Sequence, residues 1–393
     1  MKKYLLPLLA TISLSLSAGC WKKVDQISTL NEQRVYLIIS EYGNRYYHMK
    51  NDLYRSGVYY SIPDPSSNDY FNNYFTFQLK NAGDGYWNLY NVCRGSYVNA
   101  TVYSPASLID KPDGVEPSKW LIDDKYIKSH IADNLNLVFV LRNRNYYGLV
   151  SESVTKKVSH AKPYEYLYPK IYELSTLTLD ENSDFPSYLS SFDVDSVVLK
   201  RTFVDNVKNT LILPFDVPNY KKVFGDNVVA YEYSCVEGNT INFTEIDSDK
   251  LNANTPYLIK GSSFNASPYT IDATTIYPVS SGQKYNGNVI GAYKSMQAKN
   301  GYILTAKGII KYNESNEKPL LIQPYRWYFN SNISNAKLNL IDNHVSSISK
   351  IKYNHSLRKV FDIQGRVVSE DYSNFGSLPK GIYIVGGKKV VKH

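Results

Sequence analysis

Three times between Arg34 and Leu174 the chain repeats one strand–turn–strand pattern: Val35-Tyr36-Leu37-Ile38 leading to Tyr46, Tyr86-Trp87-Asn88-Leu89 leading to Tyr97, and Asn136-Leu137-Val138-Phe139 leading to Tyr147. The copies are offset by 51 and 50 residues. Short polar turns separate the two strands of each copy, at Gly43-Asn44, Arg94-Gly95 and Asn143–Asn145. Apolar residues that alternate on both sides of a polar turn predict a β-hairpin. The region is therefore predicted to hold three equivalent hairpins.

Each copy closes with a further apolar strand: Phe75–Leu79, Trp120–Ile122 and Ile171–Leu174. Three copies of a four-strand unit predict a β-trefoil over residues 33–175. This stretch resembles the ricin-B-like β-trefoils, and the resemblance implies sugar pockets beside the hairpin turns. The Gln-any-Trp triplet of that family is replaced by Phe75-Thr76-Phe77, Lys119-Trp120-Leu121 and Lys170-Ile171-Tyr172. The replacement bears on sugar binding more than on the fold, because those triplets are largely structural in the family.

The resemblance points to ligand-binding residues around each turn. A sugar ring can stack on a free aromatic face while polar side chains bind its hydroxyls. The candidates are Glu41 with Tyr47, Arg94 with Asn99, and Arg142 or Asn145 with Tyr146. Tyr46, Tyr97 and Tyr147 occupy equivalent positions in the repeats and are expected in the core. Tyr47 and Tyr146 are next to these positions and are the tyrosines expected to face solvent.

The composition favours β-structure throughout. The chain has 37 Tyr against 14 Phe and 4 Trp, and tyrosine suits strands whose side chains are half buried. Long stretches rich in Ala, Leu, Glu and Lys, which would form helices, are missing. We therefore expect an all-β protein with an N-terminal β-trefoil, a middle β-sandwich and a small C-terminal β-module.

After the trefoil, a polar stretch at residues 176–194 is predicted to be a linker. Short strands at spacings of about 8 to 15 residues then predict a β-sandwich over residues 195–342. Its landmarks are Asn209–Phe215, Pro256–Lys260 and Arg326–Phe329. These segments resemble a β-rich module of surface and secreted proteins of Bacteroidales-type bacteria. That resemblance implies an extracytoplasmic location and no catalytic role.

The last segment, residues 343–393, contains two strand pairs. Lys359–Val368 is a strand, a turn at Gln364-Gly365 and a second strand. Leu378–Val385 follows, and Gly386-Gly387 predicts a hairpin turn into Lys388–Lys392. The pattern closely resembles the C-terminal sorting domain of the type IX secretion route. A plain terminal hairpin cap is the alternative.

The first 19 residues predict a secretory signal. Lys2 and Lys3 precede an apolar stretch from Tyr4 to Leu16 that is too short to span a membrane. Ala18-Gly19-Cys20 resembles the lipobox of bacterial lipoproteins, although Ser17 stands where Leu is usual. The resemblance implies acylation of Cys20, a tether over residues 20–32, and a place in the outer membrane, on the cell surface or in the secreted fraction. A plain cleaved signal with a coincidental cysteine remains the alternative.

Charge and cysteine content exclude several classes of protein. The net charge is +8, but the basic residues are dispersed and not gathered into one stripe, so no nucleic-acid partner is expected. Apart from Cys20, only Cys93 and Cys235 are present. Two cysteines so far apart predict free thiols and no disulfide framework.

No motif for catalysis or metal binding is found. The six histidines form no His-x-x-x-His or His-Glu-x-x-His pattern, so neither a metal nor a cofactor is expected. A glycoside hydrolase would need two carboxyl groups about 5 to 10 Å apart in a cleft. The adjacent acids Asp123-Asp124 and Asp180-Glu181 are more typical of a solvated surface.

The sequence thus favours a non-catalytic binding protein of the cell surface that recognises glycans through its trefoil. The alternative is a structural or adhesive envelope protein that binds an extracellular protein partner. In both cases the membrane is reached through the lipid on Cys20, and the chain is expected to be a monomer.

Overall fold

The computed structural model describes most of the chain after the leader. The described residues are 20–42, 45–48, 61–62, 76–100, 107–109, 118–131, 136–142, 145–151, 165–186, 188–280, 282, 284–285, 288–306, 308–313, 319–331, 335–342, 359–369, 372–385 and 388–392. The predicted signal at residues 1–19 lies outside them. Nearly all the regular structure is strand, and the one α-helix among these residues is α2 (Tyr220–Phe224). The predicted all-β class is confirmed.

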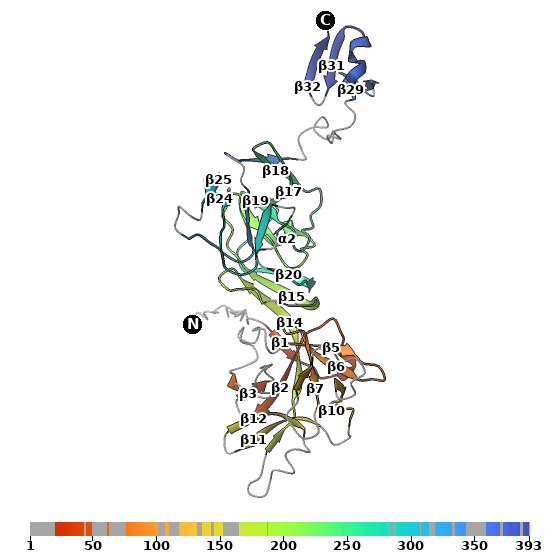
Figure 1. Cartoon of the computed structure of the whole chain (residues 1–393), viewed down its shortest axis with the longest axis vertical. Helices are drawn as coiled ribbons and strands as arrows, with labels where there is room; N and C mark the ends of the chain where they lie inside the picture. Colours follow the sequence, from red (N-terminus) through yellow and green to blue (C-terminus); the bar gives the residue numbers. More distant parts are fainter. Residues whose placement is uncertain are drawn as a thin grey trace, which may run out of the picture. The chain divides into compact units, whose positions relative to one another are not determined.

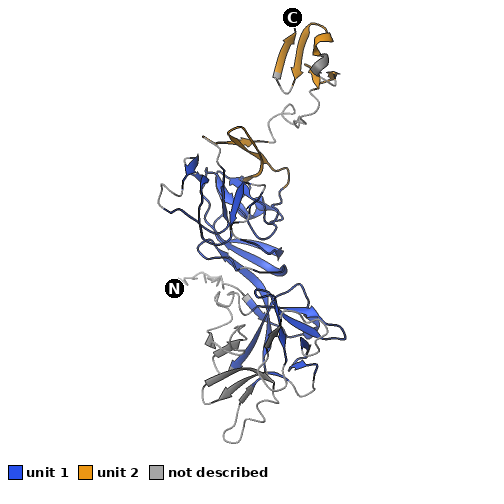
Figure 2. Cartoon of the chain, in the orientation of Figure 1, with its two compact units in different colours: residues 1–228, 249–332 blue, residues 229–248, 333–393 orange. Residues whose placement is uncertain are grey.

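The chain forms two compact units, coloured in Figure 2. The first comprises residues 1–228 and 249–332, and the second comprises residues 229–248 and 333–393. Residues 229–248 and 333–342, assigned above to the middle sandwich, therefore belong to the second unit. There β28 (Lys337–Ile341) pairs in parallel with β18 (Thr240–Glu245). Pairing between strands so distant in sequence is not visible in local patterns.

The N-terminal part of the first unit has the pairing scheme of a β-trefoil. Its strands are β2 (Tyr36–Tyr42), β3 (Arg45–His48), β4 (Ser61–Ile62), β5 (Phe77–Asn81), β6 (Trp87–Asn91), β7 (Ser96–Asn99), β8 (Ser107–Ile109), β9 (Lys119–Ile122), β10 (Ile127–Ser129), β11 (Leu137–Arg142), β12 (Asn145–Ser151), β13 (Glu165–Leu167) and β14 (Lys170–Asp180). In repeat one, β2 pairs with β3 and β5, and β3 pairs with β4. Repeat two copies this scheme with β6, β7, β8 and β9. In repeat three β11 pairs with β12 and β13, and β14 returns to β2.

The repeat positions that were predicted to be equivalent share one hydrophobic core. Tyr36, Ile38, Leu89 and Leu137 are buried in it, and Trp87 packs against it. Trp120 closes the core from β9, and its indole N–H donates to the carbonyl oxygen of Val98 at 3.0 Å. Burying such side chains is the main stabilising contribution available to a one-sided sheet.

The prediction of a linker at residues 176–194 is wrong, because both ends of this segment are strand. β14 runs on to Asp180, and β15 (Phe192–Lys200) pairs with its last five residues in parallel. Leu177 and Leu179 are buried, so the apolar alternation of the strand continues past the predicted boundary. The polar residues that suggested a linker are the crossover between β14 and β15.

The prediction of a tether at residues 20–32 is also wrong, because this segment begins with a strand that pairs with β14. β1 (Cys20–Lys23) pairs with β14 on one side while β2 pairs with the start of β14 on the other, as Figure 1 shows. A single 3-10 turn (Ile27–Thr29) follows. Trp21 and Leu30 are buried, and these two apolar side chains give the segment a reason to pack.

The rest of the first unit contains two sheets packed on each other. One includes β16 (Asn209–Leu211) and β19 (Tyr257–Lys260); the other runs β21 (Lys284–Tyr285), β22 (Val289–Ala292), β27 (Arg326–Phe329), β24 (Gly301–Thr305) and β25 (Gly308–Tyr312). The buried indole N–H of Trp327 donates to the carbonyl oxygen of Tyr257 at 2.8 Å, which joins the sheets. Strands β23 (Met296–Gln297) and β26 (Leu321–Ile322) form a separate two-stranded sheet. Strand β20 (Tyr269–Ile276) pairs with β15 and extends the large sheet that contains β14.

The second unit contains the hairpin β17 (Val229–Glu237) and β18. It also holds the small sheet β30 (Val367–Ser369), β29 (Val360–Asp362), β31 (Gly381–Val385) and β32 (Lys388–Lys392). The predicted turn at Gln364-Gly365 is confirmed, and Gly365 has a φ of 80°. The predicted Gly386-Gly387 turn lies outside the described residues. The Lys392 ammonium donates to the carbonyl oxygens of Phe375 (3.0 Å), Gly376 (2.6 Å) and Leu378, which fastens the last strand to the 3-10 turn at Tyr372–Ser377.

A buried ionic cluster lies where β14 ends. Glu181 accepts hydrogen bonds from Arg201 (2.9 Å) and Arg326 (2.6 Å) through one carboxylate oxygen, and from the Thr202 N–H (2.8 Å) through the other. The Arg201 side chain is 0% exposed and Glu181 is 12% exposed. Burial, and then the neighbouring Arg326, lower the pKa of Arg201 to about 9 despite Glu181. One carboxylate therefore holds two guanidinium groups in place.

We predict that Glu181→Ala lowers the free energy of unfolding by about 3–5 kcal/mol, because it leaves buried guanidinium charge without a partner. The measurement is urea unfolding of the full chain. Asp249→Ala is the matched control, since Asp249 pairs with Lys221 at 2.9 Å on the surface and such pairs contribute about 1 kcal/mol or less. Equal losses in the two variants would contradict a structural role for the cluster.

Candidate functional site

The predicted ligand-binding residues are distributed over the first hairpins of the three repeats. Glu41 is in β2, Tyr47 in β3, Arg94 in the turn between β6 and β7, Asn99 at the end of β7, and Asn145 and Tyr146 at the start of β12. The side chains of Tyr47, Asn145, Tyr146, Arg142 and Cys20 lie outside the described residues, although their backbones pair in strands. Among the candidates whose side chains are described, Arg94 and Asn99 are the two that lie on the same hairpin, β6–β7.

Glu41 has a structural contact. Its carboxylate accepts a hydrogen bond from the Tyr172 hydroxyl, which links β2 to β14. The side chain is exposed, but this hydrogen bond occupies one of its oxygens. In this structure Glu41 helps to close the trefoil.

The second repeat presents an aromatic pair on the outer face of its hairpin. Tyr90 of β6 and Tyr97 of β7 are cross-strand partners, and their ring centroids are 4.9 Å apart with the planes at 46°. Both rings are half buried. By contrast, Leu89, which precedes Tyr90 in β6, and Val98, which follows Tyr97 in β7, are fully buried. The prediction that Tyr97 belongs to the core is therefore wrong. Side chains alternate along a strand, and Val98 takes the inward position.

This pair was missed although the sequence contained the signal. A hairpin turn with an even number of residues pairs odd positions with even ones, and the observed turn, residues 92–95, has four. With Leu89 inward, alternation then places Tyr90 and Tyr97 together on the outer face. Aligning the tyrosines of the three repeats gave the wrong answer because it ignored the pairing within the hairpin.

Polar groups surround the tyrosine pair. The Lys80 ammonium lies 5.8 Å from the centroid of the Tyr90 ring. Asn99 is two residues from Tyr97 on the same face of β7, and its buried amide oxygen accepts no hydrogen bond from any residue in the part of the chain that the structure describes. Burial, and then Tyr97 and Cys93, raise the pKa of Tyr90, so its hydroxyl stays protonated at neutral pH. We call Lys80, Tyr90, Tyr97 and Asn99 the tyrosine surface.

The hairpin turn beside this surface is well ordered by its own hydrogen bonds. The Asn91 side-chain oxygen accepts the N–H groups of Cys93 (3.1 Å) and Arg94 (3.0 Å), and the Gly95 N–H donates to the Asn91 carbonyl oxygen (2.9 Å). Gly95 has a φ of 71°, a conformation that glycine adopts without strain. The turn can therefore support a binding surface of fixed shape.

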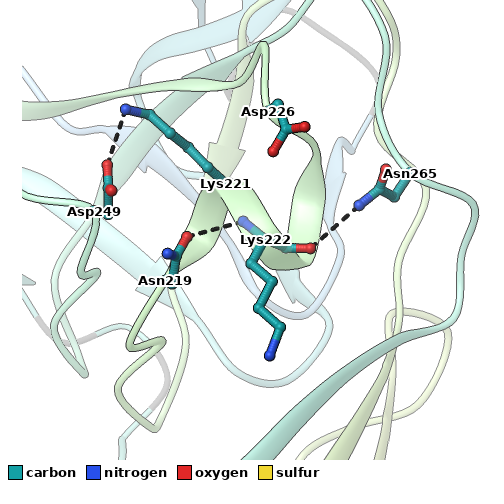
Figure 3. Close-up of a pocket in the computed structure, with 6 residues that line it drawn as sticks. All are labelled: Asn219, Lys221, Lys222, Asp226, Asp249 and Asn265. Carbon is teal, nitrogen blue, oxygen red and sulfur yellow. Dashed lines mark hydrogen bonds and ion pairs between the residues drawn. The ribbon is translucent and has the colours of Figure 1, made fainter.

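A separate polar depression of about 390 Å³ lies in the first unit around α2. It is lined by Asn219, Lys221, Lys222, Asp226, Asp249 and Asn265, as drawn in Figure 3. The Asn219 side chain accepts the Lys222 N–H at 2.9 Å and begins the helix. The Asn265 amide donates to the carbonyl oxygens of Val223 (3.0 Å) and Lys222 (3.4 Å) and ends it. Both asparagines thus have a capping role.

Charge in this depression is balanced. Lys221 pairs with Asp249, while the Lys222 ammonium and the Asp226 carboxylate form no ion pair or hydrogen bond with any described residue. Figure 3 shows the Lys222 side chain extending away from Asp226. None of the six lining residues is aromatic, so the depression has no face for stacking a sugar ring. The tyrosine surface is the stronger candidate for that ligand class.

The acidic pairs considered for catalysis have structural partners. The Asp123 carboxylate accepts Lys128 (2.6 Å) and the N–H groups of Lys125 (2.9 Å) and Tyr126 (2.7 Å). Partial burial acts to raise the pKa of Asp123, but these hydrogen bonds outweigh it and lower the pKa. Asp180 accepts the Asn182 N–H at 2.9 Å, and Glu181 is held in the arginine cluster. Each of these three carboxylates therefore stabilises a turn or a core contact.

Within the residues that the structure describes, no three His, Cys, Asp or Glu side chains gather in a way that could hold a metal ion. No helix among those residues combines the length and the apolar character needed to cross a membrane.

No family model matches the chain, and no curated protein matches it. Among solved structures, the crystal structure of Cry35Ab1 is similar, with 10% identity over 77% of this chain and 89% of that chain, at a TM-score of 0.25. A TM-score of that size supports neither a fold nor a function.

We predict that Cys93, in the turn beside the tyrosine surface, is poorly reactive in the native protein. Burial, opposed by Thr76 and Arg94, raises the pKa of its thiol from 9.0 to about 11. At pH 8 the reactive thiolate is then about 100-fold scarcer than in the unfolded chain. Iodoacetamide labelling with peptide mapping, in buffer and in urea, measures the ratio of rates. Equal rates would show that the turn opens freely.

Proposed function

We propose that this chain is a non-catalytic cell-surface binding protein that recognises glycans through its N-terminal trefoil. The observation that carries the proposal is the outward-facing pair Tyr90 and Tyr97. Aromatic rings offer a large contact area with a polar hydroxyl at the edge. A sugar ring has an apolar C–H face that can cover such a ring, and hydroxyl groups that can bind nearby polar side chains.

The groups around the pair support this ligand class. Lys80 supplies a hydrogen-bond donor, the Tyr90 hydroxyl both donates and accepts, and Asn99 adds an amide on the same face. The tyrosines are not needed to fill the core, because Leu89 and Val98 fill it from the opposite face. Half-buried aromatic side chains on an ordered hairpin are the kind of anchor that binding sites use.

The proposed location rests on the sequence. The leader with Cys20, and the resemblance of residues 343–393 to a sorting domain, both support export to the envelope. The strands formed by Val360–Asp362, Val367–Ser369, Gly381–Val385 and Lys388–Lys392 match those the sorting-domain pattern predicts. A non-catalytic role is supported by the structural contacts of Asp123, Asp180 and Glu181, which leave these acids with other tasks.

We predict that Tyr97→Ala weakens glycan binding about tenfold or more, because it removes the stacking face and part of its buried area, worth roughly 1.4 kcal/mol or more. The measurement is titration of the full chain with a panel of host, plant and microbial glycans, followed by intrinsic fluorescence. The full chain is required because β14 takes part in both the trefoil and the sheet beyond it.

Tyr277→Ala is the matched control, since Tyr277 is exposed but distant in sequence from the hairpins. The affinity of this variant for glycans should equal that of the unmodified chain. Tyr47→Ala and Tyr146→Ala test the other two hairpins in the same way. If no glycan in the panel binds, the proposal fails. Crosslinking on intact cells would then test the alternative, an envelope protein with a protein partner.

A further inference from the structure

The segment after β14 is fastened onto the hairpin that carries the tyrosine surface. The Leu189 N–H donates to the Val92 carbonyl oxygen at 2.9 Å. The Ser190 hydroxyl donates to the Gln78 side-chain oxygen at 2.6 Å, and the Gln78 amide donates to the Ser191 carbonyl oxygen at 2.8 Å. Three consecutive residues are thus held against β5 and the β6–β7 turn.

The backbone of Leu189 is held by a hydrogen bond, yet the residue is 57% exposed. On either side of it along the chain, Tyr188 and Phe192 are buried, with ring centroids 4.8 Å apart. A single exposed leucine is ordinary on a protein surface. Here, however, hydrogen bonds to Val92 and Gln78 of the trefoil hold the backbone around Leu189. The Leu189 side chain also has a defined neighbour.

That neighbour is the tyrosine surface. The Leu189 Cδ1 atom and the Tyr90 hydroxyl lie 3.1 Å and 3.7 Å from the point where Gly95 would carry a Cβ. Gly95 has no side chain, so the leucine methyl group and the tyrosine hydroxyl both lie over the turn. Leu189 therefore adds an aliphatic patch at the rim of a surface that is otherwise aromatic and polar.

We propose that Leu189 is a specificity-determining residue of the glycan site, and that the site prefers sugars whose pyranose ring carries a substituent that is, or ends in, a methyl group. An acetamido group and a 6-deoxy position both supply such a methyl group. The inference rests on the proposed function, since it assumes that a sugar ring covers Tyr90 or Tyr97. The methyl group would then lie against the Leu189 side chain and leave water.

The test compares matched sugars on the full chain by calorimetric titration: N-acetylglucosamine against glucose, and 6-deoxygalactose against galactose. Burying one methyl group is expected to give about fourfold tighter binding. The pair that shows the preference identifies the source of the methyl group. Leu189→Ser should reduce the preference to about one.

Two variants keep the test decisive. Leu189→Met retains an apolar side chain and should retain the preference, which separates the contact from a general effect on folding. Leu321→Ser is the matched control, because Leu321 is 55% exposed on β26 and should change nothing. Thermal unfolding of each variant checks that it is folded.

Three outcomes overturn the inference. Equal binding of methylated and unmethylated sugars removes it and leaves the proposed function standing. A preference that survives Leu189→Ser assigns the methyl contact to another residue. Absence of binding by all four sugars and by the glycan panel removes the inference together with the proposed function.

Discussion

Strand β14 pairs with β1, β2 and β15 along its eleven residues, and the first unit depends on the pairings with β2 and β15. Its first residues, Lys170–Glu173, pair with β2 and close the trefoil. Its last five residues, Thr176–Asp180, pair in parallel with β15 and begin the sheet that continues to β20. A strand cannot shift by one residue in one pairing without turning its buried side chains outward in the other. The register of the trefoil and that of the following sheet are therefore set together.

The end of β14 shows how this continuity reaches the candidate site. Immediately after the strand, the Glu181 carboxylate accepts hydrogen bonds from Arg201 and Arg326 in a buried cluster. The chain then passes over the second hairpin, where Leu189 and Ser190 hydrogen-bond to Val92 and Gln78. The tyrosine surface is thus supported from both sides, by its own turn and by a segment that the continuous sheet holds in place. A surface supported in this way loses little conformational freedom when a ligand binds.

Much of the fold was predictable because it depends on local alternation and on the repeat. The positions of Tyr36, Ile38, Leu89 and Leu137 in one core followed from their spacing. The extent of β14 did not, because the polar stretch around Pro186 suggested a linker from residue 176 onward, and only the pairing with β15 makes Thr176–Asp180 part of a strand. The site was predictable in part. Arg94 and Asn99 lie on the hairpin as expected, whereas Tyr90 was missed and Tyr97 was placed on the wrong face.

The sequence by itself determined the all-β class, the three hairpins and the strands of the C-terminal module, because each depends on residues close together in the chain. Only the tertiary structure decided that β14 joins the trefoil to β15 in one sheet, that Glu181 holds two arginines, and that Leu189 lies with the Tyr90 hydroxyl over Gly95. These contacts join residues about 20 to 145 positions apart. No local pattern encodes such contacts, since they exist only when the burial of many side chains elsewhere has brought the strands together.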